Sequence, residues 1–146
     1  MKRFQILFLL CLALSFTFSI FAQDTKEVII LQTSDVHSRI EPINQKGDKY
    51  YNKGGFVRRA AFLEQFRKDH KNVLLFDCGD ISQGTPYYNM FRGEVEIKLM
   101  NEMGYDAMTI GNHEFDFDVD NMARIFKMAD FPVVCANYNL DATVLK

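Results

Sequence analysis

Three short groups of polar residues in this chain carry side chains that bind divalent metal ions. Asp35 and His37 form an Asp-x-His pair, Asp80 follows a glycine, and Asn112 and His113 are adjacent. A carboxylate and a neutral imidazole together suit zinc, iron or manganese better than magnesium or calcium. We therefore expect transition-metal chemistry if the fold brings the three groups together.

The spacing within each group favours a shared ligand. In an extended chain, residues two positions apart point the same way, so both side chains of the Asp-x-His pair can reach one ion. Gly79 lets the backbone turn tightly and direct the carboxylate of Asp80 inward, and Gly111 precedes Asn112 in a similar way. Each pattern alone also occurs in turns that bind nothing, so the prediction depends on their convergence.

Each polar group directly follows a short apolar run, and these runs predict β-strands. The four runs cover residues 28–31, 73–76, 107–110 and 133–135. Their apolar residues are continuous rather than alternating, which is typical of strands that are covered on both faces of a sheet.

Helical periodicity fills the segments between the predicted strands. Three stretches place apolar residues on one helical face: Phe56, Ala60, Leu63 and Phe66; Val95, Leu99 and Met103; and Val119, Met122, Phe126 and Ala129. Thr85 and Pro86 are residue types that begin a helix. Strands in alternation with helices predict an α/β fold. Ligands bind at the carboxyl ends of such strands, where the three polar groups should meet.

Composition and charge exclude several classes of protein. The chain has 146 residues, 48% apolar and 25% charged, as in one globular domain rather than a disordered chain. Its 17 basic and 19 acidic residues give a net charge of −2. Without Lys2 and Arg3, 15 basic and 19 acidic residues remain, a net charge of −4. That charge argues against a nucleic-acid polymer as a partner.

The first 22 residues have the pattern of a secretory signal peptide. Lys2 and Arg3 precede an apolar run over residues 6–21, and Ala22 is a small residue suited to the position before cleavage. We expect export to the periplasm or the extracellular space, with no stable membrane span after the signal is removed. The alternative is an uncleaved anchor, because residues 4–22 are long enough to cross a bilayer.

Two further expectations concern residues outside the three polar groups. Cys78 and Cys135 lie beside apolar runs, so we expect two free, buried thiols, although export would permit a disulfide between them. Glu94, Glu96 and Glu102 are expected to form an exposed helix face.

The three polar groups occur in order as Asp35-x-His37, Gly79-Asp80-x-x-x-Gly84 and Gly111-Asn112-His113-Glu114. Together these motifs resemble the calcineurin-like metallophosphoesterase superfamily, and residues 93–116 are similar to its secreted 5'-nucleotidase family. The resemblance covers nearly all of residues 23–146. It implies a partial metallophosphoesterase sandwich of mostly parallel strands and helices, in which these residues form the N-terminal portion of a truncated catalytic domain.

The resemblance also implies a site for two divalent ions, with zinc, manganese or iron as the expected metals. By the family pattern, Asp35 and His37 bind one ion, Asn112 binds the other, and Asp80 bridges both. The implied function is hydrolysis of nucleotide phosphomonoesters, as in a 5'-nucleotidase, by a hydroxide that the two ions activate.

His113 and Asp116 match the catalytic pair of this family. There the histidine stabilises the developing charge or the leaving oxygen, and the aspartate orients the histidine ring. The substrate is accordingly a nucleotide or another phosphoester. The alternatives within the superfamily are a 2',3'-cyclic phosphodiester, a nucleotide sugar or a sulfur ester.

The chain also departs from the family pattern. The family completes its site with histidines on later strands, including a Gly-His-x-His element, whereas this chain has three histidines in all. Asp80 and Asn112 alone would hold the second ion, so we expect a missing C-terminal part or a companion chain to complete the site. The other hypothesis is a catalytically incompetent fragment that binds metal or a partner. Asp118 stands where the family has glycine.

Overall fold

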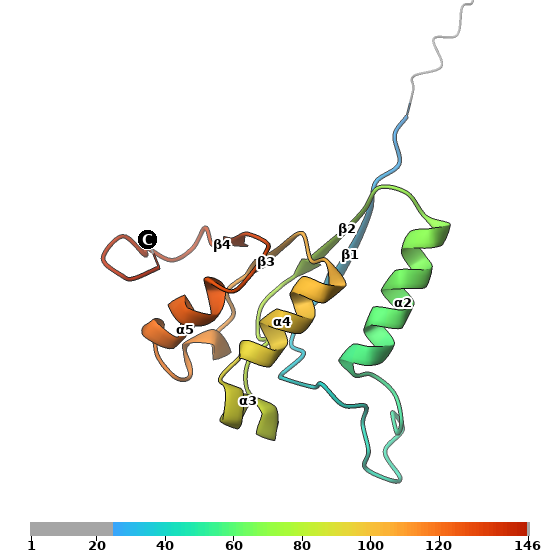
Figure 1. The fold of residues 1–146 in the computed structure, drawn as a ribbon, viewed down its shortest axis with the longest axis horizontal. Helices are drawn as coiled ribbons and strands as arrows, with labels where there is room; N and C mark the ends of the chain where they lie inside the picture. The colour runs from blue at the N-terminus through green and yellow to red at the C-terminus, as the bar shows by residue number, and fades with distance from the viewer. Residues whose placement is uncertain (1–24, 146) are drawn as a thin grey trace, which may run out of the picture.

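Four short parallel strands form one sheet, in the order β1-β2-β3-β4 (Figure 1). This computed structural model describes residues 25–145, so the expected signal peptide, residues 1–22, lies outside the described residues. The elements are β1 (Ile29–Thr33), α2 (Phe56–Asp69), β2 (Val73–Asp77), α3 (Pro86–Phe91), α4 (Glu94–Met103), β3 (Ala107–Thr109), the 3-10 helix η1 (His113–Phe115), α5 (Val119–Phe126) and β4 (Val133–Val134). The expected α/β fold is confirmed.

The register of the sheet brings the ends of its strands together. β1 and β2 pair from Ile29 opposite Val73 to Thr33 opposite Asp77. In the same way, Asp77 pairs with Met108 of β3, close to the point where that strand ends. The loops that follow β1, β2 and β3 therefore leave the sheet side by side at one edge.

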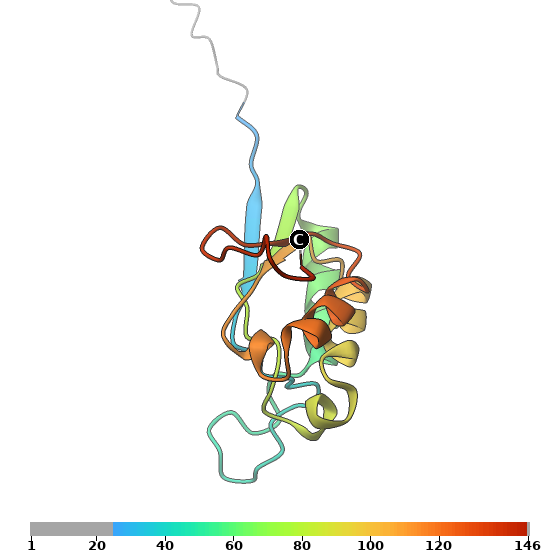
Figure 2. The same ribbon diagram turned by 90° about the vertical axis from the view of Figure 1, so that its left-hand side faces the viewer.

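The three longest helices cover the same face of the sheet. In Figure 2, α2, α4 and α5 lie to one side of the strands. The topology explains this, because right-handed crossovers between parallel strands in consecutive order all pass over one face. On the opposite face Ile30 is 63% exposed and Val134 is 54% exposed. The expectation that the strands are covered on both faces is therefore wrong for residues 25–145.

The hydrophobic core fills the space between the sheet and these helices. Leu75 and Met108 of the strands belong to the same buried cluster as Leu63 of α2, Ile97 of α4 and Ile125 of α5. Complete burial of such a side chain stabilises a fold by about 1.5–3 kcal/mol. The core thus fixes the helices on the sheet and holds the ends of the strands, from which the polar loops emerge.

The buried face of helix α4 differs from the face that the sequence predicts. Its buried residues are Glu96, Ile97, Met100 and Met103. The expected exposed face of three glutamates is therefore wrong at Glu96, which is completely buried, while Glu102 is exposed and Glu94 is half-buried. Met103 belongs to both the expected and the observed face. Apolar residues at helical spacing fit two adjacent faces of this helix, so the pattern alone does not decide which face is buried.

The two cysteines are free, as expected, but neither is buried. Side chains alternate across β2, so Asp77 is buried on the helix side and the next residue, Cys78, is exposed on the other side. There the Sγ of Cys78 lies 3.7 Å from Oε1 of Gln32. Cys135 is half-buried. The apolar runs before the cysteines predict the strands but not the face on which each thiol lies.

The residues where α3 and α5 begin are of types that favour the start of a helix. Thr85 has an extended backbone at the N-cap of α3, and Pro86 is the first helical residue, as expected. Asp118 caps α5, because its Oδ1 accepts a hydrogen bond from the backbone N–H of Asn121 at 2.6 Å. Within residues 25–145, no helix is both long enough and apolar enough to cross a membrane.

Candidate metal centre

The loop after β1 runs alongside the loop after β2. Asp35 donates its backbone N–H to the carbonyl of Gly79 at 3.1 Å, and His37 donates to the carbonyl of Asp80 at 3.1 Å. Ser38 continues this pattern with a bond of 2.8 Å to Ile81. The first two polar groups of the sequence are thus held together by their backbones, whatever their side chains bind.

Glu114 joins the loop after β3 to the loop after β2. Its carboxylate accepts hydrogen bonds from the backbone N–H groups of Asp80 (2.9 Å), Ser82 (3.2 Å) and Gly111 (2.7 Å). The side chain is 1% exposed, so the three bonds form away from water. Sequence reasoning gave Glu114 no role. Its position next to His113 in the sequence could have suggested a role, but the sequence does not show that its side chain is buried.

Two glycines allow these loops to approach one another. A Cβ at Gly79 would lie 2.5 Å from the backbone nitrogen of Gly111, and a Cβ at Gly111 would collide with the carboxylate of Asp80. Gly79 also has a φ of 95°, which favours glycine. The glycines before Asp80 and Asn112 therefore supply space for close packing, and at Gly79 glycine supplies a backbone conformation as well.

Several non-glycine residues in these loops have left-handed backbones. The φ angles are 53° at Asp35, 44° at His37, 56° at Ser38 and 57° at Asp80. Such conformations are uncommon outside glycine and cluster at functional sites, where the surrounding contacts determine them. Here the backbone hydrogen bonds between the first two loops provide those contacts, and they fix the directions of the side chains.

Three candidate residues converge at the edge of the sheet. His37, Asp80 and His113 each offer a ligand atom, and these atoms all lie within 4.8 Å of one another. The two imidazole rings are 5.0 Å apart between centroids and nearly perpendicular, at 77°. One side chain comes from each of the three loops, as expected from parallel strands that end together.

The hydrogen bonds of the two histidines fit a metal site. His37 donates from Nδ1 to the carbonyl of Ser82 at 3.2 Å, and His113 donates from Nδ1 to Oδ2 of Asp116 at 2.8 Å. Each ring thereby keeps the lone pair of Nε2 free in its neutral form. Metal-binding histidines characteristically engage their second nitrogen with a carbonyl or a carboxylate in this way. The donor set of two imidazoles and a carboxylate suits a divalent transition metal.

The other candidate residues lie in the same loops but at the margin of the cluster. Asp35 is exposed, its carboxylate accepts a hydrogen bond from the hydroxyl of Ser34, and it is not one of the three clustered residues. Asn112 is exposed and directly precedes His113 at the start of η1. Asp116 approaches the cluster through its hydrogen bond to His113. The separate roles expected for ligands and for the catalytic pair stay predictions.

Two ionisable groups near the cluster have shifted pKa values. The hydrogen bond to Asp116 raises the pKa of His113, and the negative charges of Asp80 and Glu114 act in the same direction. Burial raises the pKa of Asp77 to about 6, although Thr33 and the backbone of Gly79 donate hydrogen bonds to its carboxylate. Without a bound metal, the hydrogen bond to Asp116 thus favours the charged form of the His113 imidazole, and burial favours the protonated form of Asp77.

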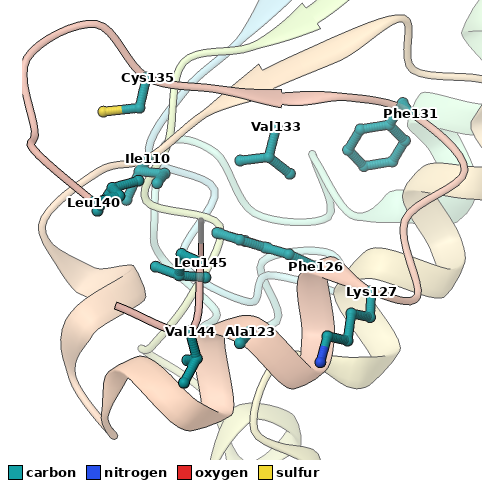
Figure 3. Close-up of a pocket in the computed structure, with 10 residues that line it drawn as sticks. All are labelled: Ile110, Ala123, Phe126, Lys127, Phe131, Val133, Cys135, Leu140, Val144 and Leu145. Atoms are coloured by element: carbon teal, nitrogen blue, oxygen red, sulfur yellow. The ribbon is translucent and has the colours of Figure 1, made fainter. Parts of the chain in front are cut away.

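An apolar pocket of about 370 Å³ lies apart from this cluster (Figure 3). Its lining comes from the end of β3, α5, β4 and the last described residues: Ile110, Ala123, Phe126, Lys127, Phe131, Val133, Cys135, Leu140, Val144 and Leu145. None of the six candidate site residues belongs to this lining within the described part of the chain.

Comparison with known proteins places these observations in context. A family model described as calcineurin-like phosphoesterase matches residues 28–143. The snake venom 5'-nucleotidase of Gloydius brevicauda is 42% identical over 115 residues, which are 76% of this chain and 20% of the venom protein. The 5'-nucleotidase of Homo sapiens is 40% identical over 116 residues, with the same two shares.

A solved structure has the same arrangement of elements. The 5'-nucleotidase precursor from Thermus thermophilus superposes with a TM-score of 0.75 at 35% sequence identity. The match covers 80% of this chain and 23% of that protein. The chain thus spans about a fifth of the length of the curated relatives that it matches.

Proposed function

This chain belongs to the calcineurin-like phosphoesterase family, and we propose that it forms part of a metal-dependent phosphoesterase that hydrolyses nucleotide phosphomonoesters. The observation that carries the proposal is the approach of His37, Asp80 and His113 to within 4.8 Å of one another. These residues come from three separate loops: His37 and Asp80 are expected ligands of a divalent ion, and His113 lies beside them, where it could reach an oxygen of a bound phosphoester.

Asp35, His37, Asp80 and Asn112 are the residues that would hold two divalent ions, with zinc, manganese or iron as the expected metals. When bound, such ions neutralise the charge of a phosphoryl group and make a water molecule acidic enough to serve as the nucleophile near neutral pH. The chain itself is acidic overall, so the ions rather than basic side chains would attract an anionic ester.

His113 and Asp116 would act on the oxygen atoms of the substrate. The carboxylate of Asp116 holds the Nδ1–H of His113, which leaves Nε2 as the atom that can present a proton to a phosphoryl or leaving oxygen. The raised pKa of His113 keeps that proton available over a wider range of pH. In this role Asp116 orients the ring and stabilises its charged form.

We further propose that residues outside this chain complete the site and that the protein is exported. The number of ligands supports completion by other residues, because in this chain Asp80 and Asn112 alone would bind the second ion. The relatives support it too, since the matched region is a fifth of their length. A snake venom protein among the relatives and the signal-like first 22 residues support export.

Hydrolysis by the natural gene product that carries these residues, followed by chromatography of the nucleoside and nucleotide products, tests the proposal. We expect hydrolysis of a nucleoside 5'-monophosphate that stops on chelation and returns with zinc or manganese. A 2',3'-cyclic nucleotide and a nucleotide sugar should be hydrolysed more slowly. Hydrolysis that is indifferent to chelation would refute the metal mechanism. Metal binding without hydrolysis of any of the three substrates would instead identify a non-catalytic metal-binding protein.

A further inference from the structure

Glu96 of α4 is a carboxyl group buried in the core rather than placed at the surface. Its side chain is completely buried on the same helix as the buried residues Ile97 and Met100. Oε1 accepts a hydrogen bond from the hydroxyl of Ser38, whereas Oε2 has no hydrogen-bond partner among the residues that the structure describes. A buried carboxyl oxygen without a partner destabilises a fold, so packing alone does not account for an acid here.

Ser38 connects this carboxyl group to the metal cluster. It is completely buried and directly follows His37 in the chain. Its N–H donates to the carbonyl of Ile81 at 2.8 Å. The hydroxyl of Thr85 donates toward Ser38 and lies 2.9 Å from its carbonyl oxygen and 3.0 Å from its hydroxyl oxygen. Ser38 is thus held by the loop after β2, by the start of α3 and by α4.

The turn that Ser38 anchors needs such support. Both His37 and Ser38 have left-handed backbones, at φ values of 44° and 56°. A turn of this kind persists only where neighbouring groups determine it. The backbone bond between His37 and Asp80 supplies one constraint from the sheet edge. The hydrogen bond from Ser38 to Glu96 supplies another from a helix 58 residues farther along the chain.

We propose that Glu96 is a positioning residue for the metal centre, because through the Ser38 hydroxyl it fixes the turn that presents the His37 imidazole to the cluster. The inference rests on the proposed function, since it requires that cluster to bind a divalent ion. Glu96 acts through Ser38 rather than on the ion itself. It keeps the imidazole in place before the ion arrives, so that binding does not have to order the turn.

Titration with cobalt(II) tests this role, because the visible absorption of cobalt reports both its binding and its ligand geometry. The natural gene product that carries these residues, freed of metal, is compared with its Glu96→Leu, Glu96→Gln and Ser38→Ala variants. Leucine keeps the bulk of the side chain and removes the acceptor, whereas glutamine keeps an acceptor oxygen. We expect Glu96→Leu and Ser38→Ala to bind cobalt about 10–100-fold more weakly with altered spectra, and Glu96→Gln to bind nearly as wild type.

Glu102→Leu is the matched control, because Glu102 lies on the same helix and is exposed. It should leave the cobalt affinity unchanged. Adding Ser38→Ala to Glu96→Leu should weaken binding no further, because both changes remove the same hydrogen bond. A purely structural role would instead lower thermal stability without changing the cobalt affinity or spectrum of the folded protein.

Cobalt affinities of Ser38→Ala and of folded Glu96→Leu equal to that of wild type would overturn the inference. If Glu96→Leu does not fold, Ser38→Ala decides the question alone, because it removes a single hydroxyl group. A wild-type gene product that binds no cobalt would refute the metal centre of the proposed function, a result distinct from equal binding by wild type and variants.

Discussion

His113 donates its Nδ1–H to Oδ2 of Asp116, three residues farther along the chain, at 2.8 Å. Both side chains lie at the start of the segment between β3 and α5, and both are only partly exposed. The carboxylate stabilises the imidazolium form, which is the principal reason that the pKa of His113 is raised. Because of Asp116, the charge of the His113 imidazole changes at a higher pH than that of an isolated imidazole.

Replacing Asp116 by asparagine should lower the pKa of His113. Because the folded-state pKa lies above the ordinary value of about 6.5, the pair stabilises the fold below that pH. This contribution is lost as the pH rises through the folded-state pKa, so wild type and Asp116→Asn should differ most in acid. NMR titration of the metal-free chain measures the shift, with the exposed His70 ring as an internal reference. An identical His113 titration in both proteins would contradict the assignment.

Replacing Asp80 by alanine should reduce the number of metal ions bound. Asp80 is one of the three clustered residues and the expected bridging ligand. Because its φ is 57°, Asp80→Asn is a useful second variant, since asparagine tolerates this backbone while it loses the charge. Elemental analysis gives the stoichiometry, and the exposed Asp130→Ala is the control. Unchanged metal content in both Asp80 variants would defeat the assignment.

Replacing Glu114 by alanine should destabilise the fold by about 3 kcal/mol or more, because three backbone N–H groups lose their shared acceptor. Urea unfolding of the chain with chelator present measures the loss without any contribution from metal binding. The exposed Glu102→Ala should stay within about 0.5 kcal/mol of wild type. Equal stability of the two variants would show that the three bonds contribute little.

Replacing Asp77 by asparagine should remove one pH dependence of stability. Burial raises the pKa of Asp77 from 3.8 to about 6, so the folded chain binds this proton more tightly than the unfolded chain. The stabilisation is complete below pH 3.8 and is lost as the pH rises through 6. Relative to Asp77→Asn, metal-free wild type should therefore lose roughly 3 kcal/mol between about pH 4 and pH 7. Parallel pH profiles for the two proteins would show that folding does not raise the pKa of Asp77.

The face of the sheet opposite the helices is left uncovered by the described residues, and it should cause copies of the isolated chain to associate with one another. Ile30 and Val134 are more than half exposed there, and the edge strand β1 pairs only with β2 among the described strands. Ile30→Lys should shift the chain toward the monomer in sedimentation velocity, whereas Val57→Lys on the exposed side of α2 is the control. A wild-type chain that stays monomeric at high concentration would contradict this expectation.

The strands and helices were predictable because their signals are local. Continuous apolar runs marked the strands, and Thr85 with Pro86 marked the start of α3. The carboxyl ends of parallel strands then implied that the polar groups meet, which agrees with the cluster of His37, Asp80 and His113. These inferences needed no knowledge of how distant side chains pack.

The remaining features depend on contacts between distant parts of the chain. Glu96 is buried because Ser38, 58 residues earlier, supplies a hydroxyl group for it. Glu114 is buried because backbone N–H groups of two loops point at its carboxylate. The exposed face of the sheet follows from the handedness of its crossovers, which a pattern of apolar residues does not encode.

The consecutive order of the strands also bears on how the protein is made. Each strand pairs with the one that precedes it in the chain, so a polypeptide leaving the ribosome can add strands one at a time to a growing edge. His37, Asp80 and His113 all precede α5 and β4 in the chain. The three clustered side chains can therefore come together at the ends of β1, β2 and β3 before α5 and β4 fold onto the sheet.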